Sequence, residues 1–358
     1  MKPLLIDTPF QEWNIKGLPV YRNKQIRKWI YEKGILDFEE MSNLPLEVRK
    51  DLGNEWDLRP MELVRVQGSQ DTTQKFLLKL RDGQLIESVL IPATQGTKGI
   101  RASRLTLCVS TQVGCGLGCK FCASGLDGLK RNLSTGEIIG QILLARSKAK
   151  RRVDNLVFMG MGEPLANLPA MIPALDQILS PEGLGIGARH ITLSTSGLAP
   201  KIIELSKYPA QIRLAISLHG GDNRTREQIM PINKRYPIEE LISACEKFIE
   251  ERKKMITLEY ILIKGVNDDL GQASLLAKHA KRLNAKVNLI PYNNVDGLEW
   301  ERPEISHIHS FHKLVEKEKA PRVTLRMEKG HDIAAACGQL RLKEKKTQNL
   351  KIFAGQKD

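Results

Sequence analysis

Short apolar runs alternate with longer amphipathic ones over more than two hundred residues, and this alternation is what most constrains the fold. The apolar runs predict strands at residues 105–110, 155–160, 190–195, 212–217, 256–263, 287–292 and 323–327. Helical periodicity falls between them, at residues 135–150, 169–179, 238–252, 274–283 and 306–319. Such alternation is typical of a parallel sheet. Because no GxGxxG turn follows a strand, we expect an α/β fold built as a partial (β/α)6 TIM-like barrel.

The N-terminal part has a different pattern. Residues 21–33 carry Ile26, Trp29 and Ile30 on one helical face, and three strands follow at residues 63–68, 75–80 and 85–92. Residues 93–103 show neither the helical nor the strand period and are interpreted as a mobile loop. The expected division is a small helical accessory domain (1–60), bridging strands and a loop (61–100), the barrel with a C-terminal catalytic loop (101–340) and a basic flexible tail (341–358).

Charge and hydropathy indicate which partners and which cellular compartment to expect for the protein. The chain has 358 residues, and 55 Lys and Arg against 41 Asp and Glu leave a formal charge of +14. This surplus favours a polyanionic partner such as nucleic acid, although a solvated basic surface accounts for it equally well. No apolar stretch is long enough to span a bilayer, and the first residues do not resemble a secretory signal. We therefore expect a cytoplasmic protein without membrane contact.

Three of the six cysteines lie within eight residues. Cys115, Cys119 and Cys122 form a CxxxCxxC motif just after the first predicted barrel strand. Three thiolates so close can hold three irons of a cubane cluster and leave the fourth iron open. The alternatives are a structural zinc site completed by a distant Cys or His, and three inert loop cysteines. Clustering in a reducing compartment favours metal ligation over disulfides.

A CxxxCxxC motif in this position resembles the signature of the radical S-adenosylmethionine (radical SAM) superfamily. The resemblance continues beyond the signature and covers about residues 15–342. Eight blocks are similar to the bacterial RNA adenine-C2 methyltransferases, the RlmN family: residues 107–115, 130–142, 159–167, 192–197, 216–220, 230–238, 287–293 and 332–340. The resemblance implies methylation of carbon 2 of an adenine in 23S rRNA at the peptidyl-transferase centre, and of the adenine 3′ of the anticodon in tRNA.

The resemblance also implies the cofactors and their ligands. One [4Fe-4S] cluster would bind Cys115, Cys119 and Cys122, and two SAM molecules would be used per turnover. Seven residues match the SAM-binding positions of the family: Gly162, Glu163, Ser194, Ser217, Leu218, His219 and Asn293. They end or follow predicted strands, where barrel enzymes place their site residues. Any one of them alone would be interpreted as a strand-end turn or cap.

Two cysteines outside the cluster acquire roles through the resemblance. Cys337 would accept a methyl group from SAM, because carbon 2 of adenine is no nucleophile. The 5′-deoxyadenosyl radical from a second SAM would activate that methyl for addition to the base. Cys108 would then release the product by forming a transient disulfide with Cys337, and Glu87 matches the proton acceptor. As isolated residues, both cysteines would be interpreted as small buried side chains.

The partners implied are 23S rRNA before full ribosome assembly, tRNA, and an electron donor such as flavodoxin or ferredoxin, with the enzyme as a monomer. Three departures from the family pattern stand out. Ala334 replaces the more usual acid, the loop 93–104 is longer, which bears on the reach of Glu87, and the tail is rich in Lys. The rival hypotheses are the sister activity that methylates carbon 8 of the same adenine, and a non-catalytic iron–sulfur protein that only binds RNA.

Overall fold

The computed structural model describes residues 1–13, 15, 18–93, 104–295, 297–318, 320–326, 329–336 and 338–340. Within these residues one ten-stranded sheet has the order β1-β2-β3-β4-β7-β8-β9-β10-β11-β12. Its strands are β1 (Met61–Gly68), β2 (Gln74–Leu80), β3 (Leu85–Pro92), β4 (Leu105–Cys108), β7 (Asn155–Phe158), β8 (Ile191–Thr195), β9 (Arg213–Ser217), β10 (Thr257–Leu262), β11 (Lys286–Pro291) and β12 (Arg322–Leu325).

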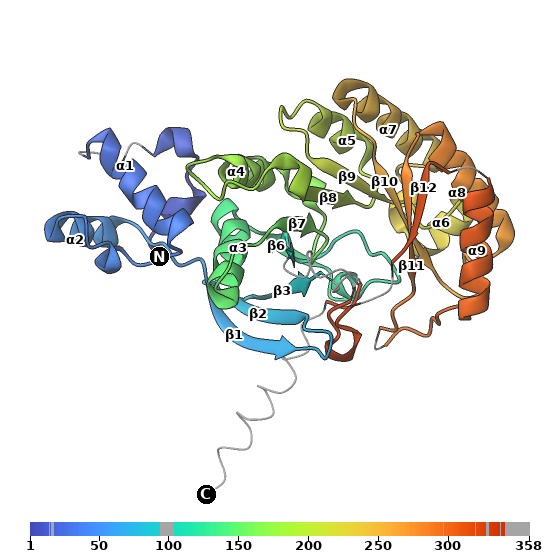
Figure 1. Cartoon of the computed structure of the whole chain (residues 1–358), viewed down its shortest axis with the longest axis horizontal. Helices are drawn as coiled ribbons and strands as arrows, with labels where there is room; N and C mark the ends of the chain where they lie inside the picture. The colour runs from blue at the N-terminus through green and yellow to red at the C-terminus, as the bar shows by residue number, and fades with distance from the viewer. Residues whose placement is uncertain are drawn as a thin grey trace, which may run out of the picture.

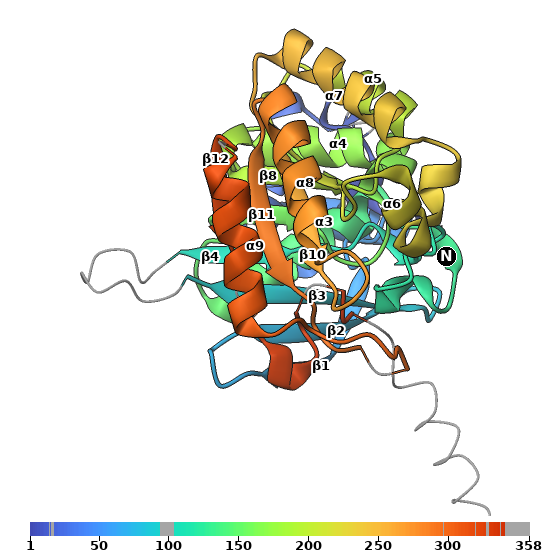
Figure 2. The same ribbon diagram turned by 90° about the vertical axis from the view of Figure 1, so that its right-hand side faces the viewer.

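From β4 to β12 every neighbouring pair of strands is parallel. The crossovers contain α3 (Thr135–Ala149), α4 (Leu168–Leu179), α5 (Ala199–Ser206), α6 (Asn223–Ile229), α7 (Ile238–Arg252), α8 (Leu270–Arg282) and α9 (Ile305–Lys317). The helices cover the outside of the curved sheet, and α8 and α9 lie together over its last strands (Figures 1 and 2). All the predicted barrel strands are present, so the partial (β/α)6 barrel is confirmed.

Local chemistry explains where several helices begin. The predicted capping box of α3 is present, because Ser134 and Glu137 bond reciprocally to each other's backbone. Helix α8 begins at Leu270, four residues before the predicted start, because the Asp269 carboxylate accepts the Gln272 N–H at 3.1 Å. The sequence did not predict α5, α6 or the hairpin formed by β5 (Gln112–Gly114) and β6 (Leu129–Asn132).

Strands β1 to β4 are antiparallel, and their register positions the start of the site. Val89 lies opposite Cys108 and Pro92 lies opposite Leu105. The Ala93 N–H then donates to the Arg104 carbonyl at 2.8 Å, so the ends of the long loop meet. The position of Glu87, two residues before Val89, is therefore set by the ladder rather than by loop length. Residues 94–103, assigned to the mobile loop, and the tail 341–358 lie outside the described residues.

The N-terminal residues form α1 (Val20–Arg27), a π-helical turn (Lys28–Glu32) and α2 (Leu46–Glu55). This helical part packs on α3 and α4 (Figure 1). The Tyr31 hydroxyl donates to Gln177 at 2.7 Å, and the Asp7 carboxylate accepts the Gly136 N–H at 2.6 Å. The buried apolar side chains of the two parts belong to one continuous core. No helix in the described ranges is long and apolar enough to cross a membrane.

Candidate active site

Two neighbouring cavities lie at the carboxyl ends of the barrel strands. The larger has a volume of about 700 Å³ and includes Cys108 in its wall. The smaller is lined by Cys115, Cys119 and Cys122 together with residues that follow β7, β8 and β9. Both cavities share Cys122 and Arg326 in their walls. They are therefore adjacent compartments of one site, with the CxxxCxxC loop on one side.

The CxxxCxxC loop can follow a tight path because glycines occupy its corners. Gly114 has φ +75°, and a Cβ there would overlap the Gly128 carbonyl. Gly118 has φ +62° and Gly128 has φ +66°. These positive φ values and close approaches favour residues without a side chain. The loop thus brings Cys119 within 3.9 Å of the Ser196 hydroxyl, at the end of β8.

The electrostatics of the loop test whether it fits an iron–sulfur cluster. Burial raises the pKa of Cys115 to about 11 and raises the pKa of Cys119 further, and the charges of nearby cysteines and of Glu163 add to both shifts. Raised pKa values keep these thiols protonated unless a cation compensates the charge of the thiolates. No three His, Cys, Asp or Glu side chains among the described residues surround a single ion. In a cubane cluster each cysteine binds a different iron, so these residues fit that group.

Glu163 is a buried carboxylate that joins two strand ends. Its Oε1 accepts the Leu165 N–H at 3.1 Å, and its Oε2 accepts the Ser196 N–H at 2.8 Å. Burial raises its pKa, and these hydrogen bonds oppose the rise. The preceding Gly162 has φ +100°, and a Cβ there would lie 2.5 Å from the Gln112 side chain. Gln112 in turn accepts the Glu163 N–H at 2.9 Å.

The other predicted SAM-binding residues divide into three groups. Ser194, Ser217 and His219 line the smaller cavity with the cysteines. Asn293 lines the larger cavity instead and accepts a hydrogen bond from Arg302 at 3.2 Å. The Leu218 side chain is fully buried in the core, and Leu218 lines neither cavity. The structure therefore brings Gly162, Glu163, Ser194, Ser217 and His219 together with the three cysteines.

His219 is held as an uncharged ring. Its Nδ1 accepts the Ile261 N–H at 3.1 Å, and its ring meets Phe121 edge-on with the centroids 4.8 Å apart. Burial lowers its pKa to about 3, and the charge of Arg226 contributes to the shift. A neutral imidazole beside the cysteine loop can contact a bound ligand without adding charge.

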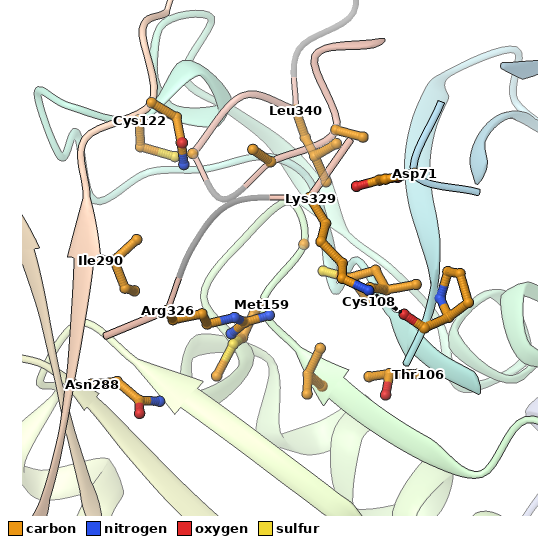
Figure 3. A pocket seen from close by; sticks show the side chains of 18 of the residues that line it. Asp71, Thr106, Cys108, Cys122, Met159, Asn288, Ile290, Arg326, Lys329 and Leu340 are labelled. Carbon is orange, nitrogen blue, oxygen red and sulfur yellow. Dashed lines mark hydrogen bonds between the residues drawn. The ribbon is translucent and has the colours of Figure 1, made fainter. Parts of the chain in front are cut away.

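Cys108 and the C-terminal segment meet at the larger cavity. Cys108 ends β4, and Lys329 extends beside it to the Pro92 carbonyl at 2.6 Å (Figure 3). Arg326, Met159 and Asn288 lie across the cavity. Cys337 lies outside the described residues. Its neighbours Ala335, Ala336, Gly338 and Leu340 all line this cavity.

Glu87 lies on β3 and is among the lining residues of neither cavity. Its carboxylate is 3.1 Å from the Lys75 ammonium, and both side chains are buried. The Ser110 hydroxyl donates to the Glu87 carbonyl at 2.6 Å.

Several residues of the site were not found from the sequence. Arg326 lines both cavities, and Glu259 lines the smaller one from the middle of β10. Arg226 is fully buried and donates to the Leu218 and Ser196 carbonyls at 3.0 and 2.6 Å. A Glu within the apolar run 256–263 was a usable signal, because unpaired acids are rare in buried strands. Arg226 and Arg326 could not be recognised from the sequence, because a basic chain has many arginines and nothing distinguishes these two.

Comparisons with known proteins agree with this geometry. Residues 109–274 match the model of the radical SAM superfamily, and residues 11–57 match that of the ribosomal RNA large subunit methyltransferase N-terminal domain. The crystal structure of a radical SAM methyltransferase from Sphaerobacter thermophilus has a TM-score of 0.89 and 40% identity, covering 95% of this chain and 99% of that one. The fold and the site thus define a radical SAM methyltransferase, with a [4Fe-4S] cluster and SAM as cofactors.

Similar sequences identify the family more narrowly. The probable dual-specificity RNA methyltransferase RlmN of Akkermansia muciniphila is 54% identical, over 94% of this chain and 93% of that protein. The dual-specificity RNA methyltransferase RlmN of Nitratiruptor is 42% identical, over 95% of this chain and 98% of that protein. The chain belongs to the RlmN family.

Proposed function

We propose that this enzyme methylates carbon 2 of an adenine in 23S rRNA and in tRNA, with Cys337 carrying the methyl group and Cys108 releasing the product. One observation carries the proposal: Cys108, the cluster-loop residue Cys122 and the residues on both sides of Cys337 line the same cavity of about 700 Å³. A non-catalytic iron–sulfur protein has no need for two further cysteines at this place.

Cys115, Cys119 and Cys122 would hold the cluster, whose chemistry when bound would be to supply the electron that cleaves SAM. Glu163, Ser194, Ser217 and His219 would hold the cofactor from the strand ends, and Leu218 would contribute backbone only. Asn293 would contact it from the larger cavity. A carboxylate fixed by two backbone N–H groups can accept a hydrogen bond from the amino group or a ribose hydroxyl without reorienting.

The thiol chemistry proceeds in two stages. The Cys337 thiolate attacks the methyl carbon of one SAM, so a new C–S bond forms at Cys337 while the sulfonium bond breaks and S-adenosylhomocysteine leaves. The methyl carbon would lose a hydrogen atom to the 5′-deoxyadenosyl radical and bond to carbon 2. The resulting adduct would give up one electron, which the oxidised cluster can accept, and Glu87 would take the proton of carbon 2. The Cys108 thiolate then attacks the Cys337 sulfur, so an S–S bond forms while the bond from that sulfur to the RNA-linked carbon breaks. That carbon takes up a proton and becomes the methyl group, and an external thiol reduces the disulfide before the next turnover.

RNA recognition is proposed for exposed basic residues on the helical N-terminal part and on α3. Lys24 and Lys28 have exposed side chains, as do Lys148 and Arg151. Arg27 has another use, because it stacks over Phe10 at 4.5 Å and pairs with Glu182. Arg146 likewise donates to the Tyr31 and Glu32 carbonyls. Lys24 and Lys28 make only exposed ion pairs, with Glu182 at 3.8 Å and Glu32 at 3.7 Å, which phosphate contacts can replace. The target base would be flipped into the larger cavity.

Further features belong to the same proposal. The chain would act in the cytoplasm, where its RNA substrates are, as a monomer reduced by flavodoxin or ferredoxin. Its parts would be the accessory domain (1–60), the bridging segment (61–100), the catalytic barrel (101–340) and the tail (341–358).

The test is made in cells that lack their own enzyme of this kind. The protein, its Cys337→Ala variant and its Cys245→Ala variant are expressed, and digested 23S rRNA and tRNA are compared by mass spectrometry with 2-methyladenosine and 8-methyladenosine standards. Cys245 is buried in α7, away from both cavities, and controls for loss of a thiol. A 2-methyladenosine signal lost only in Cys337→Ala supports the proposal. An 8-methyladenosine signal assigns the sister activity, and the absence of both from enzyme that cleaves SAM overturns RNA methylation.

A further inference from the structure

The tip of the β1–β2 hairpin contacts the segment that leads to Cys337. Figures 1 and 2 both show the segment 329–336 against this tip. The Lys75 ammonium, on β2, donates to the Ala334 carbonyl at 3.3 Å and lies 3.1 Å from the Glu87 carboxylate. The side chains of Lys75 and Glu87 are only 8% and 6% exposed. One buried cation thus joins the proposed proton acceptor to the backbone three residues before the proposed methyl carrier.

Two further contacts hold the same segment against the hairpin. The Asp71 carboxylate accepts the Gly330 N–H at 2.8 Å and the Thr73 N–H at 2.9 Å. The Asp332 carboxylate accepts the Gln70 N–H at 3.1 Å and the Ser69 hydroxyl. Four different residues of the hairpin, Ser69, Gln70, Asp71 and Lys75, therefore bind backbone or side-chain groups at 330, 332 and 334.

A buried lysine at this position is not explained by stability alone. Removing two charges from water costs free energy that their attraction only partly offsets, and apolar residues of similar volume are often as stable. Phe76 and Leu78, on the same strand, are fully buried without any charge. What an apolar side chain cannot do is donate to the Ala334 carbonyl. Ala334 has φ +50°, a conformation that an alanine adopts only when surrounding contacts impose it.

We propose that Lys75 is a positioning residue of the methyl transfer. It orients the Glu87 carboxylate and fixes the turn at Ala334, so that the residues after it enter the larger cavity in one arrangement. The proposal rests on the proposed role of Cys337. A misplacement of about 1 Å is enough to slow transfer between bound groups by orders of magnitude. The expected defect is therefore uncoupling, in which SAM is still cleaved but RNA is methylated less often.

The test uses the reconstituted holoenzyme and the variants Lys75→Met, Lys75→Arg and Asp332→Ala. Lys79→Met is the matched control, because Lys79 lies on the same strand with an exposed side chain. The first measurement is backbone hydrogen exchange of the peptide covering residues 329–340, which requires no turnover. The second is the ratio of methylated RNA to 5′-deoxyadenosine formed. Asp332→Ala breaks an exposed contact, so it keeps the test valid if Lys75→Met does not fold.

In Lys75→Met and Asp332→Ala we expect exchange in residues 329–340 to rise about tenfold and the product ratio to fall about tenfold. Lys75→Arg restores the charge and is expected to recover part of the ratio, and Lys79→Met to match the wild type. Wild-type exchange and ratio in both Lys75→Met and Asp332→Ala would overturn the positioning role. A wild-type enzyme that makes no methyladenosine would be a different result, because it would overturn the proposed function. The exchange measurement would still report on the contacts between the hairpin and residues 330–334.

Discussion

The Ser196 N–H donates to the Glu163 Oε2 at 2.8 Å, and this bond joins the ends of β7 and β8 at the smaller cavity. With the Leu165 N–H on its other oxygen, the carboxylate is fixed before any ligand arrives. Such preorganisation lowers the reorganisation needed on binding.

We expect Glu163→Gln to weaken SAM binding by about tenfold or more, because an amide nitrogen would face one of the two N–H donors and the charge would be lost. Equilibrium binding of SAM to the cluster-loaded enzyme measures the effect. Glu240→Gln, an exposed position on α7, is the control. Equal affinities in the two variants would remove Glu163 from the binding site.

Gly162→Ala is expected to lower the free energy of unfolding by about 2–4 kcal/mol, the sum of left-handed strain and overpacking against Gln112. The contrasting substitution is Gly53→Ala in α2, where a Cβ meets nothing within 4 Å. There we expect a gain of about 0.5–1 kcal/mol. Denaturant unfolding of both variants gives the comparison, and effects of the same sign would contradict the steric argument.

The pKa of His219 predicts a pH dependence of stability. The folded state keeps the ring neutral with a pKa of about 3, against an ordinary value of 6.5. Below about pH 6.5 the unfolded chain binds the proton and the folded protein does not. The free energy of unfolding should therefore fall by up to about 1.4 kcal/mol per pH unit between pH 6 and pH 4 through this residue.

In His219→Asn that contribution should disappear, since the amide oxygen can accept the Ile261 N–H without titrating. The free energy of unfolding of both proteins is measured at several pH values between 4 and 7, and the two slopes against pH are compared. Parallel pH profiles would mean that His219 is protonated in the folded state.

Ala334 has φ +50°, and this backbone conformation costs an alanine about 1 kcal/mol. We expect Ala334→Asn and Ala334→Gly to raise the thermal midpoint, because both residues adopt left-handed conformations readily. Ala335→Gly, one residue further on, should lower it. A lower midpoint in both Ala334 variants would show that the alanine is not strained.

The sequence predicted what depends on local pattern. Strand β3 has the predicted bounds, Leu85–Pro92, and α7 has the predicted bounds, Ile238–Arg252, because each has an uninterrupted period and a clear end. The β5–β6 hairpin was missed because its strands have three and four residues and contain Gly114. A strand this short has no measurable alternation.

The site was partly predictable for a related reason. Gly162, Glu163, Ser194 and Ser217 end or follow strands, and parallel strands place their ends together. Arg326 lies between the cavities because β12 is the last strand beside β11. Lys75 reaches Ala334 only through an antiparallel hairpin 259 residues earlier in the chain. Contacts of that kind depend on the assembled tertiary structure, and no local pattern reveals them.

The bond between the Ala93 N–H and the Arg104 carbonyl closes the β3–β4 connection at its base. The paired residues, from Val89 with Cys108 to Pro92 with Leu105, all lie outside residues 94–103. We therefore expect the β3–β4 register to be retained when residues 94–103 are exchanged for a peptide tag or a fluorescent label. The same bond makes this connection a natural point for tethering the enzyme to a surface in single-molecule work.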